Sequence, residues 1–418
     1  MNTTKKHATG VAGRAIGNNY LLFGISFGLA GPFMYPLGLR GMGCHIFGDS
    51  SSGKTSVLEA AASVWGHGHN FLCTWNLTAN GMETVCAEHT DTLLALDEIS
   101  EVDPRDLNRV AYSVINGQGK IRSDRSGQAR APMLWRVALL STGEHSVRAR
   151  LAEAGITIKT GQELRLVDLP VTGEKFGIFS NLHGASDGAE FANQLRTAAS
   201  QSYGHAGPMI VRAIMERDWA DLRDRHQKII TCFSASNTQE ARVAEMFAAV
   251  ALAGEIAVHA GIVPWTAATS KDFSDSDSVN ATVVLFNRWK ENRETTTSFG
   301  SEHGKILGTI LDAFEKHNDS RFSDLNATGH VTRSGAVTDP PAIRDRLGWW
   351  DDSNGDRIYL VLPNGLREIT KGYDLRRVVT ALEQAGAFTK KGSDKTSVPT
   401  RVNNQLVRLF YIDPAKLE

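Results

Sequence analysis

The stretch GDSSSGKT (residues 48–55) decides the expected fold of this chain. It satisfies the pattern of a glycine, any four residues, Gly-Lys and then Ser or Thr. The apolar run GCHIF (residues 43–47) precedes it, and a segment expected to be helical follows it to residue 65. A strand, a loop and a helix in this order begin an α/β nucleotide-binding unit. The expected fold class is therefore α/β, with a mainly parallel sheet.

Each residue type in this loop suits the binding of phosphate groups. Gly48 and Gly53 let the backbone curl so that successive N–H groups point at a phosphate, and the following helix adds the positive end of its dipole. We expect Lys54 to neutralise the β- and γ-phosphates of ATP, and Thr55 to place its hydroxyl on Mg²⁺. The residues expected to bind the nucleotide are Gly48, Asp49, Ser50, Ser51, Ser52, Gly53, Lys54, Thr55 and Ser56.

Two further apolar runs end in polar side chains that would complete such a site. TLLAL (residues 92–96) is followed by Asp97 and Glu98, and LWRVALL (residues 134–140) is followed by Ser141 and Thr142. Ligands bind at the carboxyl ends of strands in open α/β sheets. We therefore expect Asp97 to hold Mg²⁺ through water and Glu98 to polarise the attacking water. Thr142, with Ser141 as the alternative, is expected to contact the γ-phosphate or that water.

A basic segment lies between these two runs. GQGKIRSDRSGQAR (residues 117–130) has flanking glycines and alternating basic residues, which predicts a protruding β-hairpin. Lys120, Arg122 and Arg125, offset only by Asp124, would grip phosphate oxygens of DNA without reading its bases. The alternative is a solvated loop whose charges have no function.

Three arginines are candidates for stabilising transition-state charge across a subunit interface: Arg148, Arg150 and Arg165. For any one of them, a solvated arginine is the simpler interpretation. The four cysteines form no CxxC pair and no zinc-binding set with histidine, so neither a disulfide framework nor a metal finger is indicated. Reduced thiols and a cytoplasmic location are expected.

The composition is typical of a soluble globular protein with two or three domains. The chain has 418 residues, of which 41% are hydrophobic and 22% charged, and its formal net charge is −1. Balanced charge argues against a polybasic coat protein but allows nucleic acid to be held by a local basic loop. The uncharged residues 20–39 superficially resemble a signal peptide or a membrane span. Their glycines and prolines, and the nearby phosphate loop, favour a buried helix that ends near Pro32, with no membrane partner.

Three parts are predicted along the chain. Residues 1–230 are expected to form the P-loop ATPase core, residues 231–298 a helical lid or packing segment, and residues 299–418 a small winged-helix-like α+β domain. The polar residues 318–340 are expected to form a linker or an exposed turn region. Outside the motifs, we predict a strand at residues 161–170 and helices at residues 191–202, 207–225 and 241–260.

Taken in order, these motifs resemble a known family. The loop GDSSSGKTS, the preceding CHIF, the following SVWG, the run LLALDEIS, the segment GQGKIRSDRSG and the run GQELRLVDLP are similar to those of the Cch-like helicases encoded by mobile genetic elements. The resemblance covers about residues 15–295. It implies an AAA+ fold, with ATP and Mg²⁺ as cofactors. It also implies ATP-driven unwinding of DNA by a homo-oligomeric ring, expected to be a hexamer, in replication of such an element.

The resemblance also assigns roles to individual residues. Lys54 and Thr55 match the Walker A positions, Asp97 and Glu98 match Walker B, and Thr142 or Ser141 falls at sensor 1. The remaining assignments are Arg165 as the arginine finger, Arg242 at sensor 2, and Lys120 and Arg122 in the hairpin expected to touch DNA.

The chain departs from the family in one respect. Substantial sequence usually precedes the ATPase core, whereas here the core begins almost at Met1, so the chain is interpreted as a shortened form or a lineage that lost this region. Two other functions remain open: a DNA-binding ATPase switch or adaptor that regulates replication or transposition without unwinding, and, as a minor option, a small-molecule kinase. An intact Glu98 favours turnover of ATP over pure switching.

Overall fold

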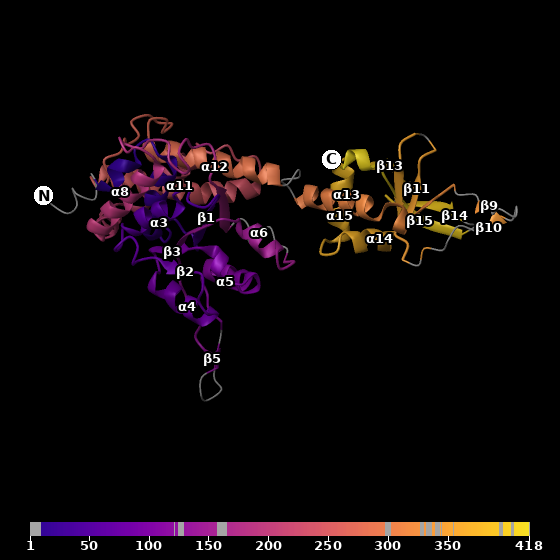
Figure 1. Cartoon of the computed structure of the whole chain (residues 1–418), viewed down its shortest axis with the longest axis horizontal. Coiled ribbons are helices and arrows are strands. Elements are labelled where there is room, and N and C mark those ends of the chain that lie inside the picture. Colours follow the sequence, from indigo (N-terminus) through magenta and orange to yellow (C-terminus); the bar gives the residue numbers. More distant parts are fainter. Residues whose placement is uncertain are drawn as a thin grey trace. The chain divides into compact units, whose positions relative to one another are not determined.

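The computed structural model of the chain divides into two compact units, Met1–Asn292 and Arg293–Glu418, which are described one at a time (Figure 1). The structure describes residues 10–417 except residues 121, 124–128, 157–164, 297–301, 327–329, 332–336, 339–342, 344, 354, 393–395 and 403–404.

A parallel five-stranded sheet forms the centre of the first unit. Its strand order is β2-β3-β6-β1-β7, and every neighbouring pair is parallel. The strands are β1 (Met42–Phe47), β2 (Cys73–Thr74), β3 (Leu93–Asp97), β6 (Ala138–Gly143) and β7 (Leu166–Pro170). β1, β3 and β6 are almost entirely buried, as in parallel sheets that helices cover on both faces. The predicted α/β class with a parallel sheet is confirmed.

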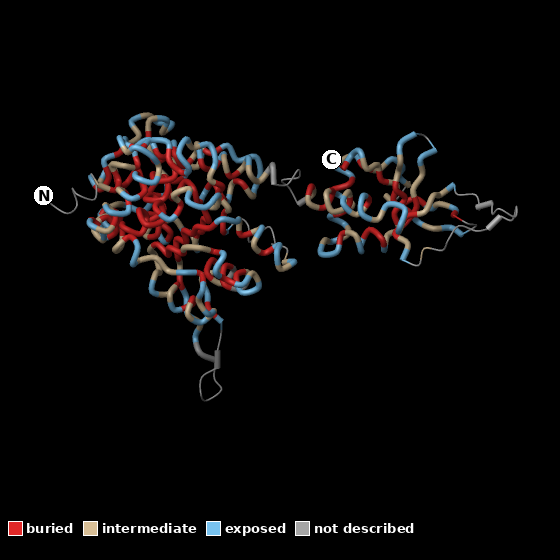
Figure 2. Tube along the Cα trace, viewed as in Figure 1, coloured by how far each residue is buried: buried red, intermediate tan, exposed pale blue. Residues whose placement is uncertain are grey.

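Helices enclose a separate hydrophobic core on each face of this sheet, and buried residues fill the interior of the unit (Figure 2). Along β3, Leu93 and Ala95 face one core, whereas Leu94 and Leu96 face the other. The first core also contains residues of α2 (Asn19–Ala30), α3 (Lys54–Ala62) and α11 (Thr238–His259); the second contains residues of α4 (Ala79–Glu88), α5 (Pro104–Asn116) and α6 (Val147–Ala152). The other described helices of this unit are η1 (Ala12–Ala15), η2 (Gly31–Phe33), η3 (Ile99–Glu101), α8 (Gly188–Gln201), α9 (Ala206–Met215), α10 (Trp219–Ile230) and α12 (Asp277–Thr296), whose last four residues follow Asn292.

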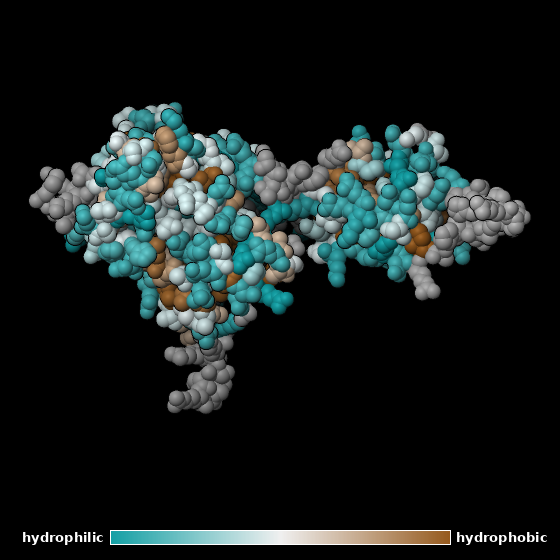
Figure 3. All heavy atoms as spheres, in the orientation of Figure 1, coloured by the Kyte–Doolittle hydropathy of each residue, from teal (hydrophilic) through white to brown (hydrophobic). Residues whose placement is uncertain are grey.

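The uncharged stretch near the start of the chain forms the buried helix α2, as predicted. Every residue from Tyr20 to Ala30 is buried. Gly28 lets α2 approach α3 closely, because a Cβ at this position would lie 2.7 Å from the carbonyl oxygen of Ala61. Among the described helices, none has the length and apolar character needed to cross a membrane. On the face that Figure 3 shows, the described surface is mainly hydrophilic, with small scattered hydrophobic patches.

Two predicted elements of the first unit differ from the structure. The helix expected at residues 207–225 is two helices, α9 and α10, because the Asp218 side chain accepts a hydrogen bond from the Ala220 N–H and starts a new helix there. The strand expected from residue 134 begins only at Ala138. Leu134 instead pairs with Gln118 at the root of a hairpin, whose strands are β4 (Arg122–Ser123) and β5 (Ala129–Arg130).

The second unit packs helices against a mixed sheet. The strand order is β13-β15-β12-β11-β8, with β14 paired to β15, and β8 and β11 are its parallel pair. Phe322 of β8 is buried in the core, so the polar stretch expected to be a linker contributes a strand instead. The elements are α13 (Glu302–Arg321), β8 (Phe322–Asp324), β9 (His330–Val331), β10 (Val337–Thr338), β11 (Gly348–Asp351), β12 (Ile358–Val361), α14 (Pro363–Ile369), α15 (Leu375–Gln384), β13 (Phe388–Lys390), β14 (Val398–Val402), β15 (Gln405–Ile412) and η4 (Pro414–Lys416).

Candidate active site

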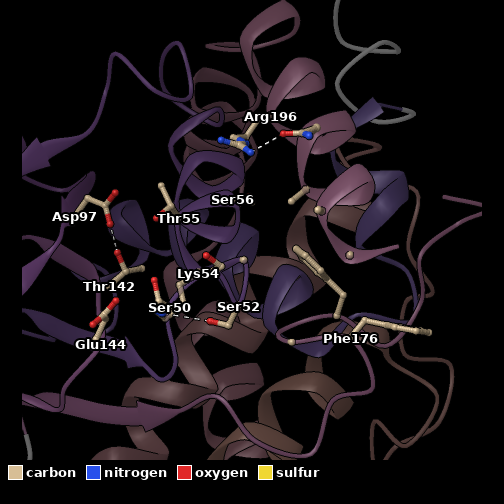
Figure 4. Close-up of a pocket in the computed structure, with 18 of the residues that line it drawn as sticks. Ser50, Ser52, Lys54, Thr55, Ser56, Asp97, Thr142, Glu144, Phe176 and Arg196 are labelled. Carbon is tan, nitrogen blue, oxygen red and sulfur yellow. Dashed lines mark hydrogen bonds between the residues drawn. The ribbon is translucent and has the colours of Figure 1, made fainter. Parts of the chain in front are cut away.

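One edge of the parallel sheet gathers the side chains that the motifs single out. β3, β6 and β1 are parallel neighbours, so their carboxyl ends meet, and the register places Ile46 beside Thr142 and Leu96 beside Ser141. A cavity of about 610 Å³ lies at this edge (Figure 4). Its lining includes Ser50, Ser51, Ser52, Gly53, Lys54, Thr55, Ser56, Asp97, Glu98 and Thr142.

The loop between β1 and α3 requires glycine at residue 53. Gly53 has a φ of +96°, and a Cβ there would lie 2.7 Å from Cε2 of Phe179. Phe179 is buried and cannot move aside. The Ile178 N–H donates to the Ser52 carbonyl oxygen at 2.9 Å, which ties the loop to the segment that follows β7. The backbone of the loop is therefore held in place by tertiary contacts.

Lys54 folds back onto the loop that precedes it. Its Nζ donates to the carbonyl oxygens of Gly48 and Asp49, at 2.9 and 2.7 Å, and to Ser52 Oγ at 3.2 Å. Burial lowers the pKa of Lys54, and nearby carboxylates, Glu144 foremost, oppose that shift. The ammonium group is thus held by neutral oxygens that an incoming anion could replace.

Asp97 and Thr142 meet at the end of the neighbouring strands. Asp97 Oδ1 accepts hydrogen bonds from the Thr142 hydroxyl and, at 3.1 Å, from the Glu98 N–H. Glu98 has a φ of +53°, a conformation that is rare for residues other than glycine and that clusters at functional sites. The Glu98 carboxylate accepts from the Ser100 N–H at 3.4 Å and from the Ser100 hydroxyl. Both carboxylates and the Thr55 hydroxyl line one cavity.

Ser141 belongs to a different environment from Thr142. It is fully buried, and its Oγ accepts from Trp75 Nε1 at 2.8 Å and lies 3.0 Å from His45 Nδ1. Burial lowers the pKa of His45 to about 4, so the imidazole is neutral. Its Nε2 must carry the proton, because its partner at 2.9 Å is the carbonyl oxygen of His145, and Ser141 then donates to Nδ1. The network supports the strand end from behind, and Thr142 is the residue that faces the cavity.

Arg150 interacts within its own chain. Its Nη2 donates to the carbonyl oxygens of Ser100 and Val102, at 2.8 and 3.3 Å, and Nη1 pairs with Glu153. Only 19% of the Arg150 side chain is exposed. Arg150 therefore supports the turn that carries Glu98.

The other predicted arginines lie outside the cavity lining. Arg165 precedes β7, at the amino edge of the sheet, and donates to Asn116 Oδ1. Arg148 is half-buried at the start of α6, where its backbone N–H donates to Asp168 at 3.3 Å. Arg242 is exposed on α11. The structure does not bring these three side chains to the Lys54 loop of the same chain.

The basic segment forms the predicted hairpin. β4 and β5 pair antiparallel, with Arg122 opposite Arg130. Lys120 is exposed at the root of the hairpin, and its backbone N–H donates to Glu83 Oε1 at 3.3 Å. Arg125 lies outside the described residues, as does the side chain of Arg122.

The lining also includes residues that belong to none of the sequence motifs, among them Glu144, Phe176 and Arg196. Glu144 follows the end of β6 by one residue, Phe176 lies in the segment after β7, and Arg196 lies on α8. Arg196 Nη2 donates to Asn193 Oδ1 at 2.6 Å, and both line the cavity (Figure 4). The position of Glu144 just beyond a strand end is a local signal, whereas Phe176 and Arg196 reach the cavity only through the tertiary fold.

The donor set of the cavity suits phosphate and a hard cation. Lys54 and Arg196 supply positive charge, and Asp97, Glu98 and Thr55 supply oxygen atoms. In the described part of the chain, no three His, Cys, Asp or Glu side chains are placed to hold a metal ion by themselves. Mg²⁺ typically binds through one or two carboxylates together with substrate phosphates and water, so the oxygens present fit this ion.

Comparison with known proteins finds a family model and solved structures that match the chain. Residues 3–134 match a protein-family model described as a domain of unknown function, DUF927. No curated protein matches the chain. A solved structure described as "SCCmec type IV Cch - active helicase" aligns over 97% of this chain and 70% of its own, with a TM-score of 0.66 and 17% sequence identity. At this identity the similarity shows a shared fold. The family model and this structure together support a relationship to the Cch-like helicases at the level of the fold.

Proposed function

We propose that the chain is an ATP-hydrolysing DNA helicase of the AAA+ type that works as a ring, with six copies as the expected number, in replication of a mobile genetic element. One observation carries the proposal: the Lys54 loop, the Asp97–Thr142 pair and Glu98 all line one cavity at the carboxyl edge of a parallel sheet. The fold shared with the Cch helicase supports the choice among the many functions of nucleotide-binding loops.

In this proposal the loop acts as Walker A. Its backbone N–H groups and the start of α3 bind the phosphates, and Lys54 exchanges its loop oxygens for phosphate oxygens. Thr55 and Asp97 would hold Mg²⁺, which neutralises charge on the phosphates when it is bound. Glu98, in the Walker B pair, orients and polarises the attacking water, and Thr142 at sensor 1 holds Asp97 in place.

The proposal also assigns roles to the domains and to the remaining basic residues. Residues 1–230 form the ATPase core, residues 231–298 its helical lid, and residues 299–418 a winged-helix-like domain. Lys120, Arg122 and Arg125 contact single-stranded DNA through its phosphates. Arg165, which is exposed, acts as the arginine finger of a neighbouring copy. Arg242 acts at sensor 2.

ATP hydrolysis by the full chain, with and without single-stranded DNA, tests the proposal first. We expect DNA to raise turnover, and we expect Glu98→Gln and Lys54→Ala each to lower turnover at least about a hundredfold, as loss of such groups typically does. Glu101→Gln is the matched control, because Glu101 is exposed and lies outside the cavity lining.

Separation of a forked DNA duplex then tests unwinding. Wild type should separate the strands only with ATP, and Lys120→Ala combined with Arg122→Ala should lose both this activity and the response to DNA. If neither DNA nor the hairpin substitutions change the rate of ATP hydrolysis, the helicase proposal is overturned and a switch or adaptor is favoured.

A further inference from the structure

The cavity extends well beyond the phosphate-binding loop. Its volume of about 610 Å³ falls in the range of small-molecule sites, roughly 300–1,000 Å³, and exceeds what phosphate groups alone would fill. Away from the loop and the strand ends, its lining comes from the segment after β7 and from α8: Phe176, Gly177, Phe179, Gly188, Ala189, Ala192, Asn193 and Arg196.

The start of α8 gives this part of the cavity a wall of small residues, next to which Asn193 and Arg196 of the same helix add polar side chains. Gly188, Ala189 and Ala192 lie on its first two turns and carry no side-chain atom beyond Cβ. The Asp187 side chain accepts from the Glu190 N–H at 2.8 Å, which fixes the first turn. The wall therefore has room for a planar group beside it.

Phe176 is an aromatic residue in the lining of the same part of the cavity. Its backbone exchanges two hydrogen bonds with Phe179, at 2.8 and 3.2 Å, in a tight turn. Phe176 is 36% exposed and belongs to the lining, and Lys175 Nζ lies 5.1 Å from the centroid of its ring. Just before this turn, Glu174 Oε1 accepts from Arg288 of α12 at 2.6 Å, so the segment is anchored to the helical layer. The ring is thus preorganised rather than carried by a free loop.

We propose that Phe176 and the α8 wall form the subsite for the nucleobase, with the base stacked on the Phe176 ring and the triphosphate directed toward Lys54. This inference rests on the proposed function, and it explains how the same cavity would bind a nucleotide more tightly than a simple polyphosphate. An aromatic ring stacks on any base with little dependence on its hydrogen-bonding edge, and a wall of small residues leaves space for that base.

Calorimetric titration of the full chain with Mg·ATP and, separately, with magnesium tripolyphosphate tests the subsite. Wild type should bind ATP at least about tenfold more tightly than tripolyphosphate, because only ATP carries a base to stack. Phe176→Ala and Ala189→Leu should each weaken ATP binding roughly tenfold and leave tripolyphosphate binding unchanged. Ala220→Leu is the matched control, since Ala220 is exposed on α10 and lies outside the lining.

Other outcomes distinguish failure of the base subsite from failure of the proposed function. If wild type binds neither ligand, the proposed function fails. If wild type binds both equally, or if the variants bind ATP as wild type does, the base subsite is refuted while the phosphate site stands. If Phe176→Ala and Ala189→Leu lose both ligands equally, these residues shape the loop and the subsite is likewise refuted.

Discussion

The position of Arg150 leads to a prediction that separates two roles for this side chain. As an arginine finger acting on a neighbouring copy, it would be free in its own chain, and its removal would leave the stability of a single chain unchanged. The structure instead ties its guanidinium to the carbonyl oxygens of Ser100 and Val102. We expect Arg150→Ala to destabilise the first unit and to lower the ATP turnover that depends on Glu98, with little change in the KM for ATP.

The magnitude follows from the contacts. A hydrogen bond from a charged donor contributes about 1.5–3 kcal/mol, and the bond at 3.3 Å to Val102 is weaker than the one at 2.8 Å to Ser100. The ion pair with Glu153, whose side chain is 45% exposed, adds less than about 1 kcal/mol. The expected loss in the free energy of unfolding is about 2–4 kcal/mol.

Urea unfolding and steady-state kinetics on the same preparations measure both effects. Arg225→Ala is the matched control, because Arg225 is 40% exposed and forms only a surface pair with Asp221, so its loss should cost less than about 1 kcal/mol. An Arg150→Ala protein that is as stable as this control but inactive would refute a positioning role within the chain. It would instead support Arg150 as an arginine finger that acts on a neighbouring copy.

Three further predictions concern the nucleotide cavity and the residues that support it. The pKa of His45 is about 4 in the folded chain and about 6.5 in the unfolded chain, so the unfolded chain binds more protons as the pH falls. The free energy of unfolding, measured in urea, should therefore fall by about 1 kcal/mol between pH 7.5 and 5.5. This loss should be absent in His45→Gln. Gly53→Ala should cost roughly 2–5 kcal/mol in the free energy of unfolding, through backbone strain and the clash with Phe179, and should lower ATP turnover. Arg196→Ala should raise the Kd for ATP roughly tenfold. The midpoint of thermal unfolding should not change, because Arg196 and its partner Asn193 are both exposed. An unchanged Kd would show that Arg196 does not contact the nucleotide.

The phosphate end of the cavity could be predicted from the sequence because its signals are local. Glycine and lysine at fixed spacing follow an apolar run, and Asp97 directly follows another apolar run. Strand direction then brings separate strand ends to one edge, since parallel neighbours share their carboxyl end. The register of β1, β3 and β6 follows this rule. Spacing and sheet geometry together were enough for Lys54, Asp97 and Thr142 to be predicted as neighbours.

Element boundaries were harder to predict because tertiary contacts decide them. The apolar run that begins at Leu134 predicts a strand there, yet Leu134 pairs with Gln118 and belongs to the root of the hairpin. Phe322 lies in a polar stretch, yet it packs against Phe314 and Tyr359 in the core of the second unit, with ring centroids 5.6 and 5.0 Å apart. Arg150 is one of several arginines in the sequence, and its burial beside the Glu98 turn has no local signal.

The two ends of the cavity follow different physical rules, which explains why only one of them has a sequence motif. Phosphates are bound by backbone N–H groups, and the backbone shape they need demands glycine at a defined position such as Gly53. A base needs only a ring to stack on and an apolar wall, and many residue combinations from any segment can supply these. Here they come from Phe176 and α8, far along the chain from the loop. In the full chain, the loop should therefore suffice to bind tripolyphosphate. The preference for a nucleotide should depend on Phe176 and the α8 wall.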